Sequence, residues 1–274
     1  MISKQYYYLV ASLAQYSMDS DTKGFDAREI REQICESLSQ EDVALVRLMY
    51  TYYDIENIVS MLKNRAKFNS LGNYTKEELE QELSSKESLP QFITDVLEAY
   101  KDPENNDSED VDTTLRIEKS LYGAFYTACA KSKNKFIRNY FEFDLNLRNV
   151  CSAYTAKRAG MEVSSEIVGD NFVSECLKRS TSSDFGLKGE VDYLDAVLAA
   201  VTNDEDLVQK EKQIDALRWS YSEDMVTFDY FSVDFVLCYL LKLNSLQRWK
   251  ELKGDKAREV FKELLSKLVD TNIA

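Results

Sequence analysis

Residues that interrupt helices are scarce in this chain, which has 8 glycines and 2 prolines among 274 residues. Glycine and proline mark sharp turns, so a chain this poor in both has few places to reverse tightly. Apolar residues recur instead at the spacing of one helix face, as at Leu121, Phe125 and Cys129. No stretch alternates as a half-buried strand, and only 163–173 leaves room for a small strand pair. We therefore predict an all-α fold with at most a minor strand pair.

Local signals place two helix starts and one linker. Thr75 followed by Glu78 is a capping-box pattern, in which each side chain accepts a hydrogen bond from a free backbone N–H. Pro90 suits the first turn of a helix that runs to Tyr100. The stretch 101–113 holds six acidic residues, one lysine and almost no apolar side chain. We predict that this stretch is a solvated linker loop.

The composition excludes most catalytic chemistry. The chain has no histidine, which removes histidine general bases, Ser-His and Cys-His nucleophiles and histidine metal ligands. Its five cysteines are dispersed without a C-x-x-C pair, a pattern typical of reduced core thiols in the cytosol. No P-loop sequence is present, and the kinase-like triplet at 184–186 stands without its companion motifs, so we interpret it as a turn. We expect no catalytic residue, no metal site and no cofactor.

The charge of the chain favours basic partners, and solubility alone is the alternative interpretation. With 34 basic and 48 acidic residues the net charge is −14, which opposes binding to nucleic acid. A local basic strip around Lys131 and Lys135 is a candidate contact for a partner, with a solvated helix face as the alternative. The longest apolar run, 235–241, is too short to cross a bilayer, and no signal peptide is visible. We expect a cytoplasmic protein that reaches a membrane only through its partners.

One pattern recurs three times along the chain, with a Tyr four residues before an Asp that bulky apolar residues flank. The spacing between copies is 90 residues, at Tyr50 and Asp54, Tyr140 and Asp144, and Tyr230 and Asp234. A constant period indicates that one helical unit has been copied. We predict three pseudo-repeats, 1–89, 90–180 and 181–274, packed as a funnel or an arc.

The three aspartates have a structural interpretation. An Asp that opens an apolar helix is a good N-cap, because its carboxylate accepts hydrogen bonds from the free N–H groups of the first turn. We predict this capping role for Asp54, Asp144 and Asp234.

Two of these segments resemble a known family, the V-type ATPase subunits that join the central stalk to the membrane rotor ring. Asp54 and Asn57, followed by 62–65 with Arg65 at its end, resemble the D-x-x-N-(I/L) … L-(K/R)-x-(K/R) segment of that family. The stretch 143–150, with Asn146 and Arg148, resembles the matching segment of a later repeat, and the opening 6–13 resembles the family's start. The resemblance implies an all-helical, three-fold pseudo-repetitive funnel that sits on the rotor ring and receives the foot of the stalk.

The expected function is therefore that of a non-catalytic coupling protein within a V-type ATPase or ATP synthase. Its partners would be the central-stalk subunit and the membrane rotor-ring subunit, with contacts at Arg65, Arg148, Lys131 and Lys135. The alternative is a helical adaptor or assembly protein unrelated to an ATPase. A helical hydrolase with paired carboxylates is a third interpretation, but no paired acidic motif supports it.

Overall fold

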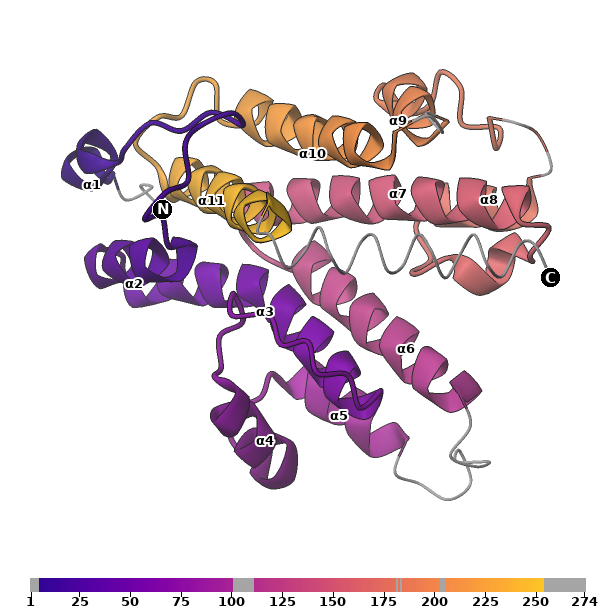
Figure 1. Ribbon diagram of the computed structural model, residues 1–274, viewed down its shortest axis with the longest axis horizontal. Helices are drawn as coiled ribbons and strands as arrows, with labels where there is room; N and C mark the ends of the chain where they lie inside the picture. Colours follow the sequence, from indigo (N-terminus) through magenta and orange to yellow (C-terminus); the bar gives the residue numbers. More distant parts are fainter. Residues whose placement is uncertain (1–4, 101–110, 181, 183, 203–205, 254–274) are drawn as a thin grey trace. The chain divides into compact units, whose positions relative to one another are not determined.

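The computed structural model describes residues 5–100, 111–180, 182, 184–202 and 206–253, and these are helical or irregular, with no strand among them (Figure 1). The predicted all-α fold is confirmed. The stretch 163–173, where a strand pair had room, holds the 3-10 helix η2 (Val163–Glu166) and the start of α8 (Phe172–Arg179). No described helix is long and apolar enough to cross a membrane.

The described residues form two compact units, one made of 5–38 with 226–253 and the other of the described residues between 39 and 225. The first unit contains α1 (Tyr7–Ser12), α2 (Ala27–Ser37) and α11 (Val233–Lys253), with α2 packed against α11. Asp26 caps α2 by accepting hydrogen bonds from the backbone N–H groups of Arg28 and Glu29. The predicted division into three repeats, and their arrangement as a funnel, stay a prediction.

The second unit holds the remaining helices and is organised around α7. They are α3 (Gln40–Leu62), α4 (Lys76–Ser85), α5 (Gln91–Ala99), α6 (Val111–Ala130), α7 (Lys135–Arg158), α8, α9 (Leu194–Val201) and α10 (Leu207–Asp224). α6 packs against α3, α5 and α7, while α7 also contacts η2, α8, α9 and α10 (Figure 1). Apolar side chains of α7, such as Leu147 and Val150, form one buried cluster with residues of α8 and α9.

The local start signals are confirmed with small shifts. Thr75 and Glu78 form the capping box at α4, with N–H to oxygen distances of 2.7 and 3.2 Å. Pro90 is the residue just before α5, and Tyr100 is the residue just after it. Residues 101–110 of the predicted linker lie outside the described residues, and α6 already begins at Val111, so the linker ends earlier than predicted. The triplet at 184–186 is a turn, as expected.

The capping role predicted for the three aspartates is wrong. Asp54 lies in the second half of α3 and Asp144 in the middle of α7, where Ser39 and Asn134 are the caps. Asp234 is the second residue of α11, and it is Ser232 that accepts the N–H of Phe235, at 3.4 Å. α3 and α7 begin well before the motif, so Asp54 and Asp144 lie too far inside their helices to cap them. The carboxylates of Asp54 and Asp144 are satisfied by distant residues instead.

The three tyrosines of the motif also differ. Tyr50 and Tyr140 are buried within α3 and α7, whereas Tyr230 precedes α11 and is 56% exposed. The third copy of the pattern therefore sits in a different environment from the first two.

One asparagine of α3 and one of α7 make equivalent hydrogen bonds, but their spacing along the chain differs from the 90 residues of the Tyr–Asp pattern. Asn57 donates from Nδ2 to the carbonyl of Asn69 at 2.9 Å and accepts the N–H of the same residue at 2.7 Å. Asn149 makes the same pair of hydrogen bonds with Val168: it donates to the carbonyl at 2.7 Å and accepts the N–H at 3.1 Å. From Asn57 to Asn149 the offset is 92 residues, as it is from Asp54 to Asn146. In each case a buried Asn of a long helix holds the backbone of the segment that follows that helix.

Candidate functional site

A surface cavity of about 630 Å³ opens on the second unit, and we call it the acidic-aromatic pocket. Four parts of the chain line it: residues of α7, the start of α8, the loop before α9, and α10. The lining residues are Asn139, Glu142, Phe143 and Asn146 from α7, Asn171 to Val173 at α8, 190–193 from the loop, and Tyr221 from α10. These parts are distant in sequence and meet only because α7 contacts α8, α9 and α10.

Three aromatic rings line the pocket and contact one another. Phe143 stacks on Tyr221 with ring centroids 3.8 Å apart and an interplanar angle of 9°. Tyr193 meets Phe143 edge-on, at 4.7 Å and 84°. Phe143 is buried, whereas Tyr193 and Tyr221 are half-buried, so part of each tyrosine is accessible from the cavity. The edge-to-face contact is a geometry that the ring quadrupoles favour, and the two close contacts of Phe143 restrict how the rings can turn.

Asn146 joins three of the four lining segments. Its Nδ2 donates to the phenol oxygen of Tyr193 at 3.0 Å, and its Oδ1 accepts from Nδ2 of Asn171 at 2.7 Å. Asn171 in turn caps α8 by accepting the N–H of Ser174 at 2.9 Å. A single buried amide of α7 therefore positions both the loop at Tyr193 and the first turn of α8.

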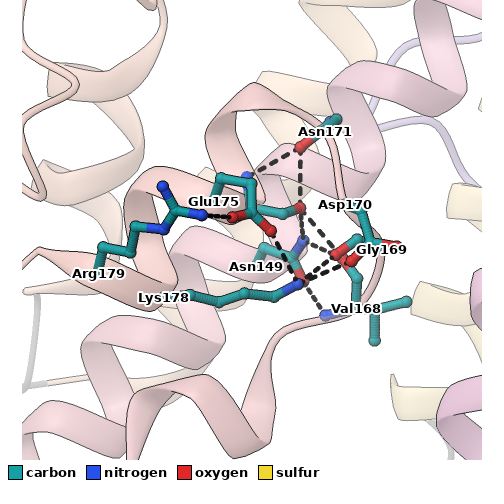
Figure 2. Close-up of polar contacts among 9 residues, drawn as sticks. Asn149, Val168, Gly169, Asp170, Asn171, Glu175, Lys178 and Arg179 are labelled. Atoms are coloured by element: carbon teal, nitrogen blue, oxygen red, sulfur yellow. Dashed lines mark hydrogen bonds and ion pairs between the residues drawn. The ribbon is translucent and has the colours of Figure 1, made fainter.

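The segment that leads into α8 is held by a dense set of polar contacts (Figure 2). Asn149 and Ser174 both donate to the carbonyl of Val168, at 2.7 and 3.1 Å. Lys178 reaches back from α8 to the carbonyl of Gly169 and the carboxylate of Asp170, each at 2.9 Å. These contacts hold Val168, Gly169 and Asp170, so the segment that leads to the lining residue Asn171 is formed before any ligand arrives.

The charge of the pocket is negative. Glu142, Glu190 and Asp192 line it and are exposed, and no lysine or arginine occurs among its described lining residues. In the part of the chain that the structure describes, no three acidic, cysteine or histidine side chains are grouped closely enough to hold a metal ion. The three carboxylates are therefore not grouped as metal ligands would be.

The two tyrosines of the pocket stay protonated at neutral pH. Burial raises the pKa of Tyr193 to about 12, against the hydrogen bond from Asn146, which lowers it. Burial also raises the pKa of Tyr221, and the negative charge of Glu142 adds to the effect. The rings thus present neutral phenols beside carboxylates.

A buried ion network beside the pocket holds α10 against α7. Asp144 accepts hydrogen bonds from Nε of Arg148 at 2.7 Å, from Nε of Arg218 at 2.9 Å and from the hydroxyl of Tyr126 at 2.7 Å. Burial alone would raise the pKa of Asp144, but the charges of Arg148 and Arg218 outweigh it and hold that pKa well below its usual range. Because Asp144 adjoins Phe143, and Arg218 is one helical turn before Tyr221, the network also fixes the stacked ring pair.

The residues proposed from sequence as partner contacts do not belong to this pocket. Arg65, Lys131 and Lys135 are exposed, and none of them lines the cavity. Arg148 has a structural role instead, because it pairs with Asp144 and lies 4.6 Å above the ring of Tyr52. Of the motif residues, only Asn146 reaches the pocket.

Sequence reasoning missed the residues that define the pocket, namely Glu142, Tyr193 and Tyr221. Their separation along the chain carries no pattern that a single sequence reveals. The one available signal was Asn171, which stands before α8 as a typical N-cap residue.

A family model described as "Protein of unknown function (DUF2764)" matches residues 3–272. A protein of Chlamydia pneumoniae, named only as uncharacterized, is 26% identical over 201 residues, which cover 70% of this chain and 73% of that protein. No solved structure matches the chain.

These findings correct the resemblance to the V-type ATPase family. The family model that covers nearly the whole chain is a different one, and neither it nor the chlamydial relative indicates part of an ATPase. The resemblance rested on short motifs at Asp54 and Asp144. Those residues lie inside helices and serve contacts particular to this fold, so a few shared letters were not enough to identify a family.

Proposed function

Because this chain belongs to the family of proteins of unknown function whose model spans it, we propose its function from the site itself. We propose that the protein is a non-catalytic helical adaptor that holds a partner protein at the acidic-aromatic pocket. The observation that carries this proposal is a pocket whose walls are fixed by hydrogen bonds and ring stacking, and whose described lining offers rings, amides and carboxylates.

The chemistry of the lining favours binding over turnover. Among its described residues there is no thiol, aliphatic hydroxyl or amine that could act as a nucleophile. Exposed aromatic surface with nearby polar groups is typical of protein contact sites, where tyrosine contributes large area at a low entropic cost. The rotor-coupling role stays an untested prediction and receives no support from the family membership.

Site-specific photo-crosslinking tests the adaptor role. A benzophenone amino acid replaces Glu190, an exposed lining residue, and in a matched control it replaces Glu77, an exposed residue of α4 outside the pocket. In cells that make the protein, position 190 should give a discrete crosslinked partner that position 77 does not. The purified partner should then bind the Tyr221→Ala variant at least about tenfold more weakly than the unmodified protein, since an aromatic anchor contributes about 2 kcal/mol or more. The proposal fails if positions 190 and 77 give the same products, or if pocket substitutions leave partner affinity unchanged.

A further inference from the structure

We infer that the acidic-aromatic pocket recognises an arginine side chain, with its guanidinium plane against the ring of Tyr221 and its N–H groups on the carboxylates of the lining. The ring of Tyr193 is inclined at 79° to that of Tyr221, so it would meet the edge of the same guanidinium. This inference rests on the proposed function, because it names the chemical group by which a partner would be held. It is carried by the sign of the charge, the kind of surface and the spread of the acceptors in the cavity.

The sign of the charge selects a cation. Glu142, Glu190 and Asp192 contribute three negative charges, and the described lining contributes no positive one. An anionic group entering this cavity would meet like charge from several sides, which disfavours it, while a cationic group would be attracted during approach and after docking. Besides burial, the negative charge of Glu142 raises the pKa of both Tyr193 and Tyr221, so the carboxylate of this lining residue lies near the two rings.

The aromatic lining selects a flat, weakly hydrated cation. A guanidinium group stacks on aromatic faces and loses less hydration than an ammonium group on leaving water. Tyr193 and Tyr221 are both half-buried and partly accessible. Phe143 packs against both rings and is itself buried. Rings already held in place need no rearrangement to receive such a plane.

The spread of the acceptors selects a ligand with several donors. The carboxylates are not grouped closely enough to hold a metal ion. A guanidinium group carries five N–H donors that point in different directions, so it can reach separated carboxylates and the amide of Asn139 together. A cavity of about 630 Å³ also leaves room for the backbone of a peptide beside the arginine.

The same chemistry is used inside the protein. Arg148 places its guanidinium carbon 4.6 Å above the ring of Tyr52 and donates from Nε to Asp144 at 2.7 Å. That arrangement joins an aromatic face and a carboxylate around one guanidinium. The pocket offers the same two kinds of group, without a cation of its own among the described lining residues.

The test uses three short peptides that differ at one central residue, which is arginine, lysine or citrulline. Citrulline keeps the planar shape but is neutral, so it isolates the charge, and lysine keeps the charge but lacks the plane. Binding is followed on the full-length protein by two-dimensional NMR, through the backbone amide shifts of 190–193. We expect the arginine peptide to bind about tenfold more tightly than the citrulline peptide and about threefold more tightly than the lysine peptide.

Matched variants show whether the peptide occupies this pocket. The double variant Glu142→Gln with Asp192→Asn should weaken binding of the arginine peptide about tenfold, and Tyr221→Leu should remove the preference over lysine. Glu77→Gln, which removes an exposed carboxylate outside the pocket, should change nothing. The inference is overturned if the citrulline or lysine peptide binds as tightly as the arginine peptide, if no shift occurs up to about 10 mM peptide, or if the double variant binds normally.

The two proposals fail separately. A partner crosslinked at position 190 whose binding is insensitive to its arginines would leave the adaptor role intact and overturn the arginine inference. The opposite result is an arginine peptide that binds the pocket while crosslinking finds no pocket-specific partner. It would overturn the adaptor role and leave the arginine inference intact.

Discussion

Arg218 of α10 donates from Nε to the carboxylate of Asp144 in α7 at 2.9 Å, across 74 residues of chain. Arg218 also donates to Asp215 at 3.0 Å, and Asp144 receives two further donors, from Arg148 and Tyr126. This contact joins two helices that no local sequence pattern pairs. Asp144 lies in the middle of α7, where the backbone N–H groups are bonded within the helix. These three side-chain donors satisfy its buried carboxylate instead.

Removing that carboxylate should destabilise the protein far more than losing a helix cap would. Asp144→Ala leaves Arg218 with Asp215 as its remaining carboxylate partner and removes the acceptor of Arg148 and Tyr126, and breaking a largely buried network in this way costs about 3 kcal/mol. Denaturant unfolding measures the change. The double variant Asp144→Leu with Arg218→Met should recover only part of the loss, because it removes the charge of Arg218 but also takes a partner from the buried carboxylate of Asp215. A loss of about 1 kcal/mol for Asp144→Ala, the size typical of a cap, would show that the network contributes little.

The same network should make stability fall in acid. The pKa of Asp144 is held below its unfolded value of about 3.9. The stability it contributes is therefore complete above that unfolded value and is lost as the pH drops toward the lower folded value. Comparison of unfolding free energies between about pH 5 and about pH 2 checks this. The Asp144→Asn variant should show a smaller decrease over that window, and an equal decrease in both proteins would contradict the assignment.

Asn57 and Asn149 should contribute similar amounts to the free energy of unfolding. Asn57→Ala and Asn149→Ala each take the acceptor from one backbone N–H, at Asn69 or Val168, and remove one of the donors to the carbonyl of that residue, which costs about 1–3 kcal/mol. Hydrogen exchange should show faster exchange of the amide of residue 69 or 168 in the corresponding variant. Gln81→Ala, an exposed substitution in α4, serves as the control and should change stability by less than about 0.5 kcal/mol. Unchanged exchange at both amides would refute the equivalence between α3 and α7.

Two glycine substitutions should have opposite effects. A Cβ at Gly72 would lie 2.7 Å from Oδ1 of Asp54 and 3.1 Å from Nδ2 of Asn57, both of which are held by other contacts. Gly72→Ala should therefore destabilise by about 1–3 kcal/mol. At Gly123, inside α6, the nearest atom is 4.0 Å away, so Gly123→Ala should stabilise by about 0.5–1 kcal/mol through helix propensity. Thermal unfolding of the two variants should move in opposite directions, and a shift of the same sign would count against the argument.

The helices of this protein follow from local chemistry that the sequence displays. Apolar spacing, the capping box at Thr75 and the scarcity of glycine and proline act over a few residues, so they are readable without a structure. These signals led to the all-α fold and to the start of α4. The regularity of the Tyr–Asp pattern was also visible, but its meaning was not, because the pattern alone does not show where each helix begins.

Only the tertiary structure decided what the polar residues do. Asp144 belongs to an ion network rather than a helix cap because Arg218 lies beside it. Asn146 lines a pocket because Asn171 and Tyr193 are its hydrogen-bond partners. The physical reason is that a buried polar side chain must find its partners wherever the packed helices bring them, because leaving it unpaired is costly. Helix formation is settled within a few residues of sequence, whereas hydrogen-bond partners and the pocket they shape are settled by which helices lie side by side.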